Sequence, residues 1–230
     1  MTKFASLCSG IGGLDIVCKK FGWEPAWHAE VEPNATLVHA ERFGNKPNYG
    51  DISQISWADI QKPDVLTAGY PCQPFSYAGS RKGEDDHRHL WPHIKQTIHI
   101  LRPETILLEN VPGHITKGLP TVLQDLEDVG YTTKWMQQEA QILAGVIAEN
   151  ESGYWLNKRQ GYTSRQCPRR TSSPRKQNYY QPRWWMLGYP AGWVTDPRLE
   201  IKRMNQYRLL GNAVQPQTAQ EAYTRLFQQG

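Results

Sequence analysis

The chain of 230 residues, with 39% hydrophobic and 21% charged residues, has the composition of a globular protein and is long enough for one sizeable domain. The longest apolar run, residues 142–148, is far shorter than the roughly 20 residues that span a bilayer, which argues against a membrane helix. We expect no signal peptide, because no sustained apolar stretch follows the N-terminus. The four cysteines lack disulfide or zinc-ligand spacing, so we predict reduced thiols, no bound metal and a cytoplasmic location.

Short apolar runs alternate with segments of helical periodicity through the first part of the chain. Strands are predicted at residues 3–7, 25–29, 64–68 and 104–108, and helices at residues 13–21, 33–43, 90–101, 119–129 and 216–227. Such alternation is typical of a parallel sheet covered by helices on both faces. We therefore predict an α/β fold of the doubly wound, Rossmann-like class.

Residues 139–181 show no strong periodicity and concentrate positive charge. Residues 1–113 carry 11 Lys and Arg against 13 Asp and Glu, whereas residues 114–230 carry 15 against 9. Basic residues mixed with Tyr and Trp suit a phosphate backbone and unstacked bases, although a solvated basic loop would look the same. The pattern predicts three parts: an α/β domain at 1–138, a small basic recognition region at 139–203 and a C-terminal segment at 204–230 that returns to the sheet.

The turn after the first predicted strand is rich in glycine. In open α/β sheets, ligands bind at the carboxyl ends of the strands, and this turn is the usual approach to a nucleotide. Glu30 ends the second strand at the distance where such folds place an acid on ribose hydroxyls, and Asp51 could accept from a purine amine. A tight turn and two surface carboxylates would explain each feature singly, but their order favours an adenosine-containing cofactor.

Cys72 lies between Pro71 and Pro74, just past the strand at 64–68. The prolines restrict the backbone around the thiol, which suggests a positioned nucleophile rather than a small core residue. Glu109 follows the strand at 104–108 and would lie on the same rim of the sheet if the two strands are neighbours. Addition of a thiolate to C6 of cytosine makes C5 nucleophilic, and a carboxylic acid at N3 assists that addition.

These motifs resemble those of C5-cytosine-specific DNA methyltransferases of the phage and restriction-modification type. "SLCSGIGGLD" resembles the first motif of that family, "GYPCQPFSYAG" its Pro-Cys motif and "LLENVPG" its Glu-Asn-Val motif. "RLLGNAVQPQTAQEAYTRL" resembles the final motif, and "WWMLGYPAGW" the segment that often precedes it in phage-like members. The match covers most of the chain, and the motifs occur in the family's order.

The resemblance implies a methyltransferase that uses S-adenosyl-L-methionine and acts on C5 of a flipped cytosine in double-stranded DNA. It implies Cys72 as the nucleophile and Glu109 as the partner of N3, with a loop from Ser76 to Arg88 that closes over the base. A cognate restriction endonuclease is a candidate partner. The cofactor-binding residues that it implies are Cys8, Gly10, Ile11, Gly12, Gly13, Glu30, Val31, Asp51, Ile52, Pro71, Asn212 and Val214.

Two features depart from the family's pattern. Cys8 stands where members often have an aromatic residue that packs on the adenine. After Trp135 the expected Gln-x-Arg-x-Arg pattern is absent, and Lys158, Arg159 and Arg165 are candidates for DNA contact without spacing that assigns them the missing role. A compact natural form, the loss of part of the recognition domain and an altered reading frame after Gln141 would all give this sequence.

Three other functions stay open from the sequence. A silent protein that binds S-adenosylmethionine or DNA is favoured by the missing arginines and disfavoured by the complete Pro-Cys and Glu-Asn-Val pair. An RNA cytosine methyltransferase would use the same chemistry on another polymer. A nicotinamide oxidoreductase is disfavoured because the turn lacks the expected glycine spacing.

Overall fold

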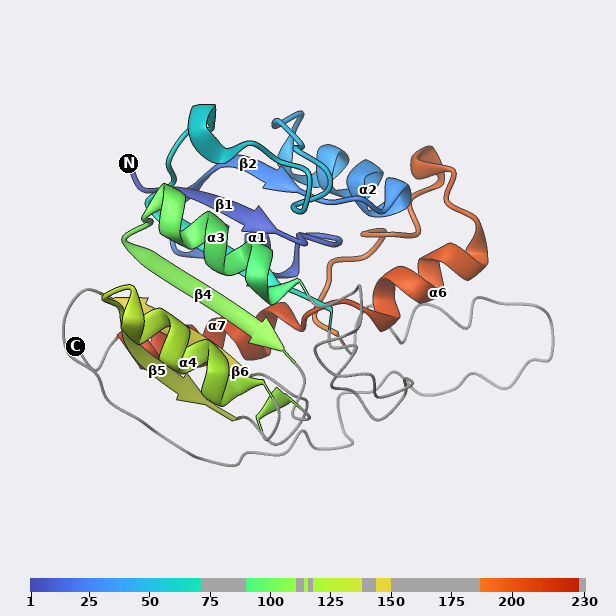
Figure 1. The fold of residues 1–230 in the computed structure, drawn as a ribbon. Coiled ribbons are helices and arrows are strands. Elements are labelled where there is room, and N and C mark those ends of the chain that lie inside the picture. Colours follow the sequence, from blue (N-terminus) through green and yellow to red (C-terminus); the bar gives the residue numbers. More distant parts are fainter. Residues whose placement is uncertain (72–89, 111–113, 116–117, 138–143, 150–186, 228–230) are drawn as a thin grey trace.

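A computed structural model of the chain describes residues 1–71, 90–110, 114–115, 118–137, 144–149 and 187–227, and only the backbone of residues 144–149. The strands within these ranges form one six-stranded sheet of order β2-β1-β3-β4-β6-β5 (Figure 1). They are β1 (Lys3–Leu7), β2 (Glu24–Ala29), β3 (Val65–Gly69), β4 (Thr105–Asn110), β5 (Thr132–Met136) and β6 (Ala144–Glu149). The first four strands of the sheet pair in parallel, whereas β6 runs antiparallel to both β4 and β5.

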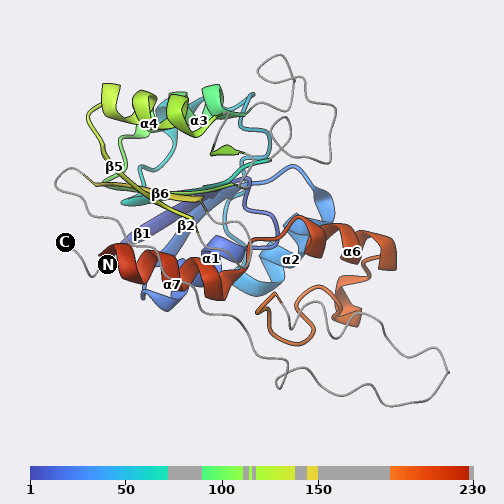
Figure 2. The ribbon, with the colours of Figure 1, turned by 90° about the horizontal axis from the view of Figure 1, so that it is seen from below.

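Helices cover both faces of the sheet (Figure 2). One face carries α1 (Gly13–Lys20), α2 (Pro33–Phe43) and α7 (Pro216–Phe227), and the other carries α3 (Trp91–Leu101) and α4 (Leu119–Asp128). Further out lie α6 (Arg203–Gly211) and two short 3-10 turns, η1 (Trp57–Asp59) and η5 (Pro197–Leu199). The prediction of an α/β fold with a mostly parallel sheet and helices on both faces is confirmed. Among the described helices, none is both long and apolar enough to cross a membrane.

The parallel strands are apolar because both of their faces are buried. Successive side chains of a strand point to opposite faces, so Ile106 and Leu108 pack beneath α3 and α4 while Leu107 packs beneath α1 and α7. All three are buried, with at most 2% of the residue exposed. Burying such a side chain stabilises the fold by about 1.5–3 kcal/mol, which explains the continuous apolar run of β4.

The C-terminal helix α7 completes the core beside α1. Its Tyr223 is buried, and the phenol O–H donates to the backbone carbonyl of Leu108 at 3.3 Å. Ala219, Ala222 and Leu226 of the same helix pack with Val17 and Cys18. A helix more than 190 residues downstream therefore fixes the position of α1, whose first residue ends the glycine-rich turn.

Two strands and one helix lie outside the predicted elements. β5 lies just before residue 138, where the sequence predicts the end of the α/β domain, and β6 extends the sheet past it. The predicted division into three parts stays a prediction. In α6 only Leu209 and Leu210 are buried. Two adjacent apolar residues do not produce the helical periodicity by which a helix is recognised in a sequence.

Candidate active site

The parallel order brings several predicted residues to one edge of the sheet. β1, β3 and β4 are neighbours, so the residues that follow their carboxyl ends lie side by side. Gly69 of β3 is in register with Glu109 of β4, while the glycine-rich turn follows β1. The chain enters the Pro-Cys motif directly from β3, through Tyr70 and Pro71.

The glycine-rich turn adopts left-handed backbone at three positions, with φ of 51° at Cys8, 55° at Gly10 and 82° at Gly12. At Gly12 a side chain would also overlap the ring of Phe43, because an added Cβ would lie 2.2 Å from a ring carbon. Glycine is therefore required at this position for two reasons, backbone conformation and space.

Glu30, the predicted ribose partner, ties this turn to the start of α2. One carboxylate oxygen accepts from the backbone N–H of Gly10 at 2.7 Å, and the other accepts from that of Glu32 at 2.8 Å. Each oxygen keeps a further lone pair, and the residue is only partly buried. The neighbouring Val31, two residues past the end of β2, is 66% exposed.

Asp51, the predicted adenine partner, is an exposed carboxylate whose Oδ1 accepts from both the backbone N–H and the hydroxyl of Ser53, at 2.9 and 2.8 Å. These hydrogen bonds hold the pKa of Asp51 below its usual value, so the group is ionised at neutral pH. Among the described residues no hydrogen bond reaches Oδ2, so this oxygen can accept from an amine. Ile52 beside it is buried and anchors the segment in the core.

The thiol of Cys8 is unsuited to nucleophilic chemistry. Burial, and then the carboxylates of Glu30 and Asp51, raise its pKa to about 12, so it stays protonated at neutral pH. Cys8 packs against the core beneath α3. Its role in cofactor binding stays a prediction.

A small cavity lies beneath the turn and is lined by polar groups that lack partners. Ser9 Oγ, Asp15 Oδ2 and Thr67 Oγ1 line it, and each is buried without a hydrogen bond to any described residue. The other oxygen of Asp15 accepts from the hydroxyl of Ser6 at 2.6 Å and lies 2.9 Å from His39 Nε2. Because unsatisfied buried polar groups are costly, this cavity is suited to a polar ligand atom or a water molecule.

Glu109 occupies the end of β4 and is held largely away from water. Burial raises the pKa of its carboxyl to about 8, so the group carries a proton at pH 7. A Cβ at Gly69 would lie 3.5 Å from Glu109 Oε2 and 3.4 Å from Val214 Cγ2. The absence of a side chain at Gly69 thus leaves room between strand ends where a neutral acid can donate a hydrogen bond.

The segment before α7 reaches this edge of the sheet. The phenol of Tyr189 donates to the backbone carbonyl of Val214 at 2.8 Å, and both lie close to Gly13 of the turn. Val214 also lines the cavity, together with Gly69 and Leu14. Asn212 is exposed and ends α6.

Three polar residues at this edge are absent from the sequence prediction. Asn110 donates to the carbonyl of Tyr70 at 3.4 Å, and the phenol of Tyr70 lies 3.1 Å from His114 Nε2. These contacts join the ends of β3 and β4 directly before the Pro-Cys motif. The only signal in the sequence is the position of Tyr70 and Asn110 next to predicted functional residues.

Six predicted site residues lie outside the described residues: Cys72, Ser76, Arg88, Lys158, Arg159 and Arg165. Their roles stay predictions. The described residues that gather at the edge are Cys8, the glycines of the turn, Glu30, Asp51, Pro71, Glu109 and Val214.

Gly12→Ala is expected to destabilise the protein by about 2–4 kcal/mol, because it adds left-handed strain and forces Phe43 to move. Gly22→Ala is the matched control, since Gly22 has a φ of 80° but an added Cβ meets nothing within 4 Å. Urea unfolding of both variants separates the two effects. Equal losses of stability in the two variants would show that moving the Phe43 ring costs no measurable free energy.

The family comparison matches residues 2–143, more than half of the chain, to the family described as C-5 cytosine-specific DNA methylase. The type II methyltransferase M.NgoBI of Neisseria gonorrhoeae is 39% identical over 137 residues, which cover 57% of this chain and 43% of that protein. The DNA N-6-adenine-methyltransferase of Escherichia phage P1 is 40% identical over 129 residues, which cover 50% of this chain and 17% of that protein.

Among solved structures, the Dnmt2 methyltransferase of S. pombe superposes with a TM-score of 0.75 and covers 99% of each chain. At 16% sequence identity this likeness shows a shared fold. The chain spans less than half the length of the first curated relatives that it matches, between 32% and 43%. The family match and the ordered motifs nonetheless agree, and they confirm the resemblance: the chain belongs to the C-5 cytosine-specific DNA methylase family.

Proposed function

We propose that the protein transfers a methyl group from S-adenosyl-L-methionine to C5 of cytosine in double-stranded DNA. The observation that carries the proposal is the neutral carboxyl of Glu109, which lies in register with Gly69, three residues before Cys72. Family membership supports the cofactor and the substrate class.

The proposed chemistry assigns one step to each of two side chains. The thiolate of Cys72 adds to C6 of the cytosine, while the protonated carboxyl of Glu109 donates a hydrogen bond to N3 and accommodates the electron density that reaches the ring. C5 then becomes nucleophilic. After methyl transfer, a base removes the proton from C5, the C6–S bond breaks and the thiolate is released.

The described residues fit the proposed cofactor. S-adenosylmethionine supplies an electrophilic methyl group on a sulfonium. Glu30 and Asp51 offer free lone pairs for ribose hydroxyls and a purine amine, and the unpartnered oxygens of the cavity can accept from a polar group. Cys8, Gly10–Gly13, Val31, Ile52, Pro71, Asn212 and Val214 are proposed to contact the cofactor as well.

The proposed DNA contacts rest on the sequence. The segment from Ser76 to Arg88 is proposed to close over a flipped base, and Lys158, Arg159 and Arg165 to contact phosphates, which position a protein without specifying a sequence. A restriction endonuclease that shares the target sequence remains the proposed partner.

One relative is named for a different reaction, methylation of adenine N6. An exocyclic amine carries its own lone pair and needs no covalent activation by a thiol, so the pairing of Glu109 with the Pro-Cys motif favours cytosine C5. Adenine methylation is therefore the second candidate.

A single assay distinguishes the candidates. The protein is incubated with methyl-labelled S-adenosylmethionine and either mixed-sequence duplex DNA or total tRNA, and the polymer is then digested to nucleosides and separated. We expect label in 5-methyl-2′-deoxycytidine from DNA alone. Label in N6-methyl-2′-deoxyadenosine or in 5-methylcytidine would replace the proposal by the adenine or the RNA activity. No label despite measurable cofactor binding would identify a silent binding protein.

A further inference from the structure

Residues 187–199 form a segment that contacts both α2 and the glycine-rich turn. Trp193 lies near the middle of this segment. The indole N–H of Trp193 donates to the backbone carbonyl of Ile11 at 2.9 Å, across 182 residues of sequence. The indole ring stacks edge-on against Phe43, with ring centroids 5.8 Å apart. The ring of Phe43 lies directly beside Gly12. Trp193 therefore contacts the turn in two ways, directly through Ile11 and indirectly through Phe43.

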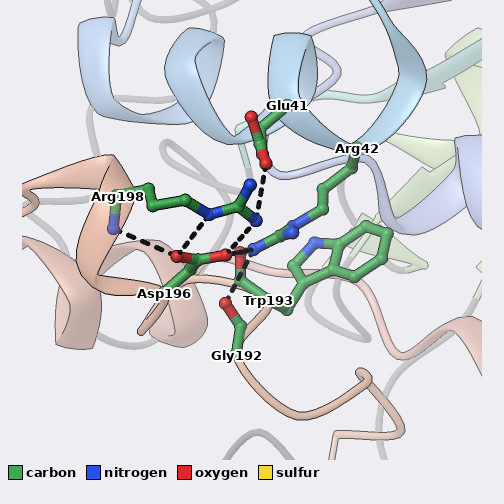
Figure 3. Close-up of polar contacts among 6 residues, drawn as sticks. All are labelled: Glu41, Arg42, Gly192, Trp193, Asp196 and Arg198. Atoms are coloured by element: carbon green, nitrogen blue, oxygen red, sulfur yellow. Dashed lines mark hydrogen bonds and ion pairs between the residues drawn. The ribbon is translucent and has the colours of Figure 1, made fainter.

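Arg42 of α2 holds Trp193 in place (Figure 3). Its guanidinium donates to the carbonyl of Gly192 at 2.8 Å and to that of Trp193 at 3.1 and 3.2 Å, and it lies 5.5 Å from the centroid of the indole ring. Asp196 lies 3.5 Å from the same guanidinium. The side chains of Arg42 and Asp196 are only 17% and 15% exposed, so these contacts are screened less by solvent than surface ion pairs are.

Arg198 forms an outer layer of the same cluster. Its guanidinium contacts Asp196 at 2.7 Å and Glu41 at 2.8 Å, but its side chain is 72% exposed (Figure 3). Exposed ion pairs contribute about 0–1 kcal/mol. The contacts that matter for the turn are therefore those of Arg42 and Trp193.

The turn needs such support from outside. Ile11 stands between Gly10 and Gly12, two left-handed glycines, and glycine permits many backbone conformations at little cost. Within the turn one backbone bond is present, from the N–H of Gly12 to the carbonyl of Ser9 at 2.9 Å, and Glu30 holds the N–H of Gly10. The Ile11 carbonyl is thus fixed by the indole of Trp193.

We propose that Trp193 is a positioning residue for the cofactor: its hydrogen bond to Ile11 holds the glycine-rich turn in the conformation that binds S-adenosylmethionine, and Arg42 holds Trp193. This inference rests on the proposed function. It gives the segment at residues 187–199 a role in cofactor binding. This segment is remote from the turn in sequence and contacts it without following any strand of the sheet.

The test is the change Trp193→Phe, which removes the N–H and keeps an aromatic ring. Trp23→Phe is the matched control, because Trp23 packs with Phe21 and Phe227 in an aromatic cluster away from the turn. Isothermal titration calorimetry with S-adenosylmethionine gives separately the Kd and the competent fraction, which is the fraction of the protein able to bind the cofactor. We expect Trp193→Phe to raise the Kd about three- to tenfold, the effect of one net hydrogen bond, with the competent fraction and Tm near those of the wild type.

A double-mutant cycle with Arg42→Lys tests the second half of the proposal. Lysine keeps the positive charge but lacks the planar guanidinium, which donates to the two carbonyls of Gly192 and Trp193 at once. We expect the single variants to raise the Kd similarly and the double variant to raise it no further, because both act through the Ile11 bond. If Trp193→Phe fails to fold, the Kd of Arg42→Lys is compared with that of the wild type. An unchanged Kd would then overturn the inference.

The outcomes are distinguishable. A lower Tm or a smaller competent fraction with an unchanged Kd would mean that Trp193 has a purely structural role and would overturn the inference, while the proposed function would stand. Wild-type protein that binds no S-adenosylmethionine would overturn the proposed function and the inference together.

Discussion

Cys72→Ala is expected to abolish methyl transfer while leaving the Kd for S-adenosylmethionine nearly unchanged. In the proposed chemistry the thiolate makes C5 reactive by adding to C6, and no other group proposed for the site can form that bond. Cys8, which lies in the glycine-rich turn, cannot substitute, because burial raises its pKa to about 12 and keeps it a thiol.

Covalent trapping measures this directly. Fluorine at C5 blocks the final elimination, so duplex DNA that contains 5-fluorocytosine should hold the wild-type enzyme as a stable thioether adduct. Cys18→Ala is the matched control, since Cys18 is buried in α1 among core residues, and it should still form the adduct. An adduct formed by Cys72→Ala would refute the assignment of the nucleophile.

Glu109→Gln is expected to lower the rate of methyl transfer about 10²- to 10⁴-fold, the usual contribution of a general acid. Glutamine keeps a hydrogen-bond donor but cannot exchange a proton with N3. Because burial raises the pKa of Glu109 to about 8, the wild-type rate should also fall as pH rises through about 8, while the residual rate of the variant should show no such fall. A variant that keeps the same high-pH decline would assign that titration to another group.

The same pKa has a consequence for stability with a definite sign. The folded protein holds the proton of Glu109 more tightly than the unfolded chain, whose pKa is near 4.5, so the stabilisation is complete below about pH 4.5 and is lost as pH rises towards 8. Urea unfolding at pH 5, 7 and 9 should show this decline in the wild type and a smaller one in Glu109→Gln. Glu104→Gln, an exposed carboxylate just before β4, is the matched control and should behave as the wild type.

The sequence predicts the elements whose pattern is local. β1, β3 and β4 are apolar on both faces, and α2 and α7 show helical spacing, so their bounds are predicted to within a residue or two. β6 was visible only as an apolar run, since its place between β4 and β5 depends on pairing across the sheet. β5, with only five residues and mixed polarity, gives no periodic signal of its own.

The candidate site divides in the same way. The positions of Glu30 and Glu109 could be predicted because the carboxyl ends of parallel strands meet at one edge, whereas Asp51 lies in the segment between α2 and η1. The roles of all three stay predictions. Trp193 and Asp15 could not, because their roles depend on contacts with residues that no local pattern relates, such as the Trp193 bond to Ile11 and the Asp15 contact with His39.

The place of β6 between β4 and β5 also dictates an order of assembly. β5 precedes β6 in the chain yet hydrogen-bonds only to β6 within the described sheet, so it cannot join the sheet until β6 has been inserted beside β4. The four parallel strands can associate first, and their sheet is then open at β4 as well as at β2. Unpaired edges recruit strands from other chains, and non-local pairing is slow, so mispairing during refolding should concentrate at β4 until β6 closes it. By pairing with β4, β6 therefore also protects the folding chain from aggregation at that edge.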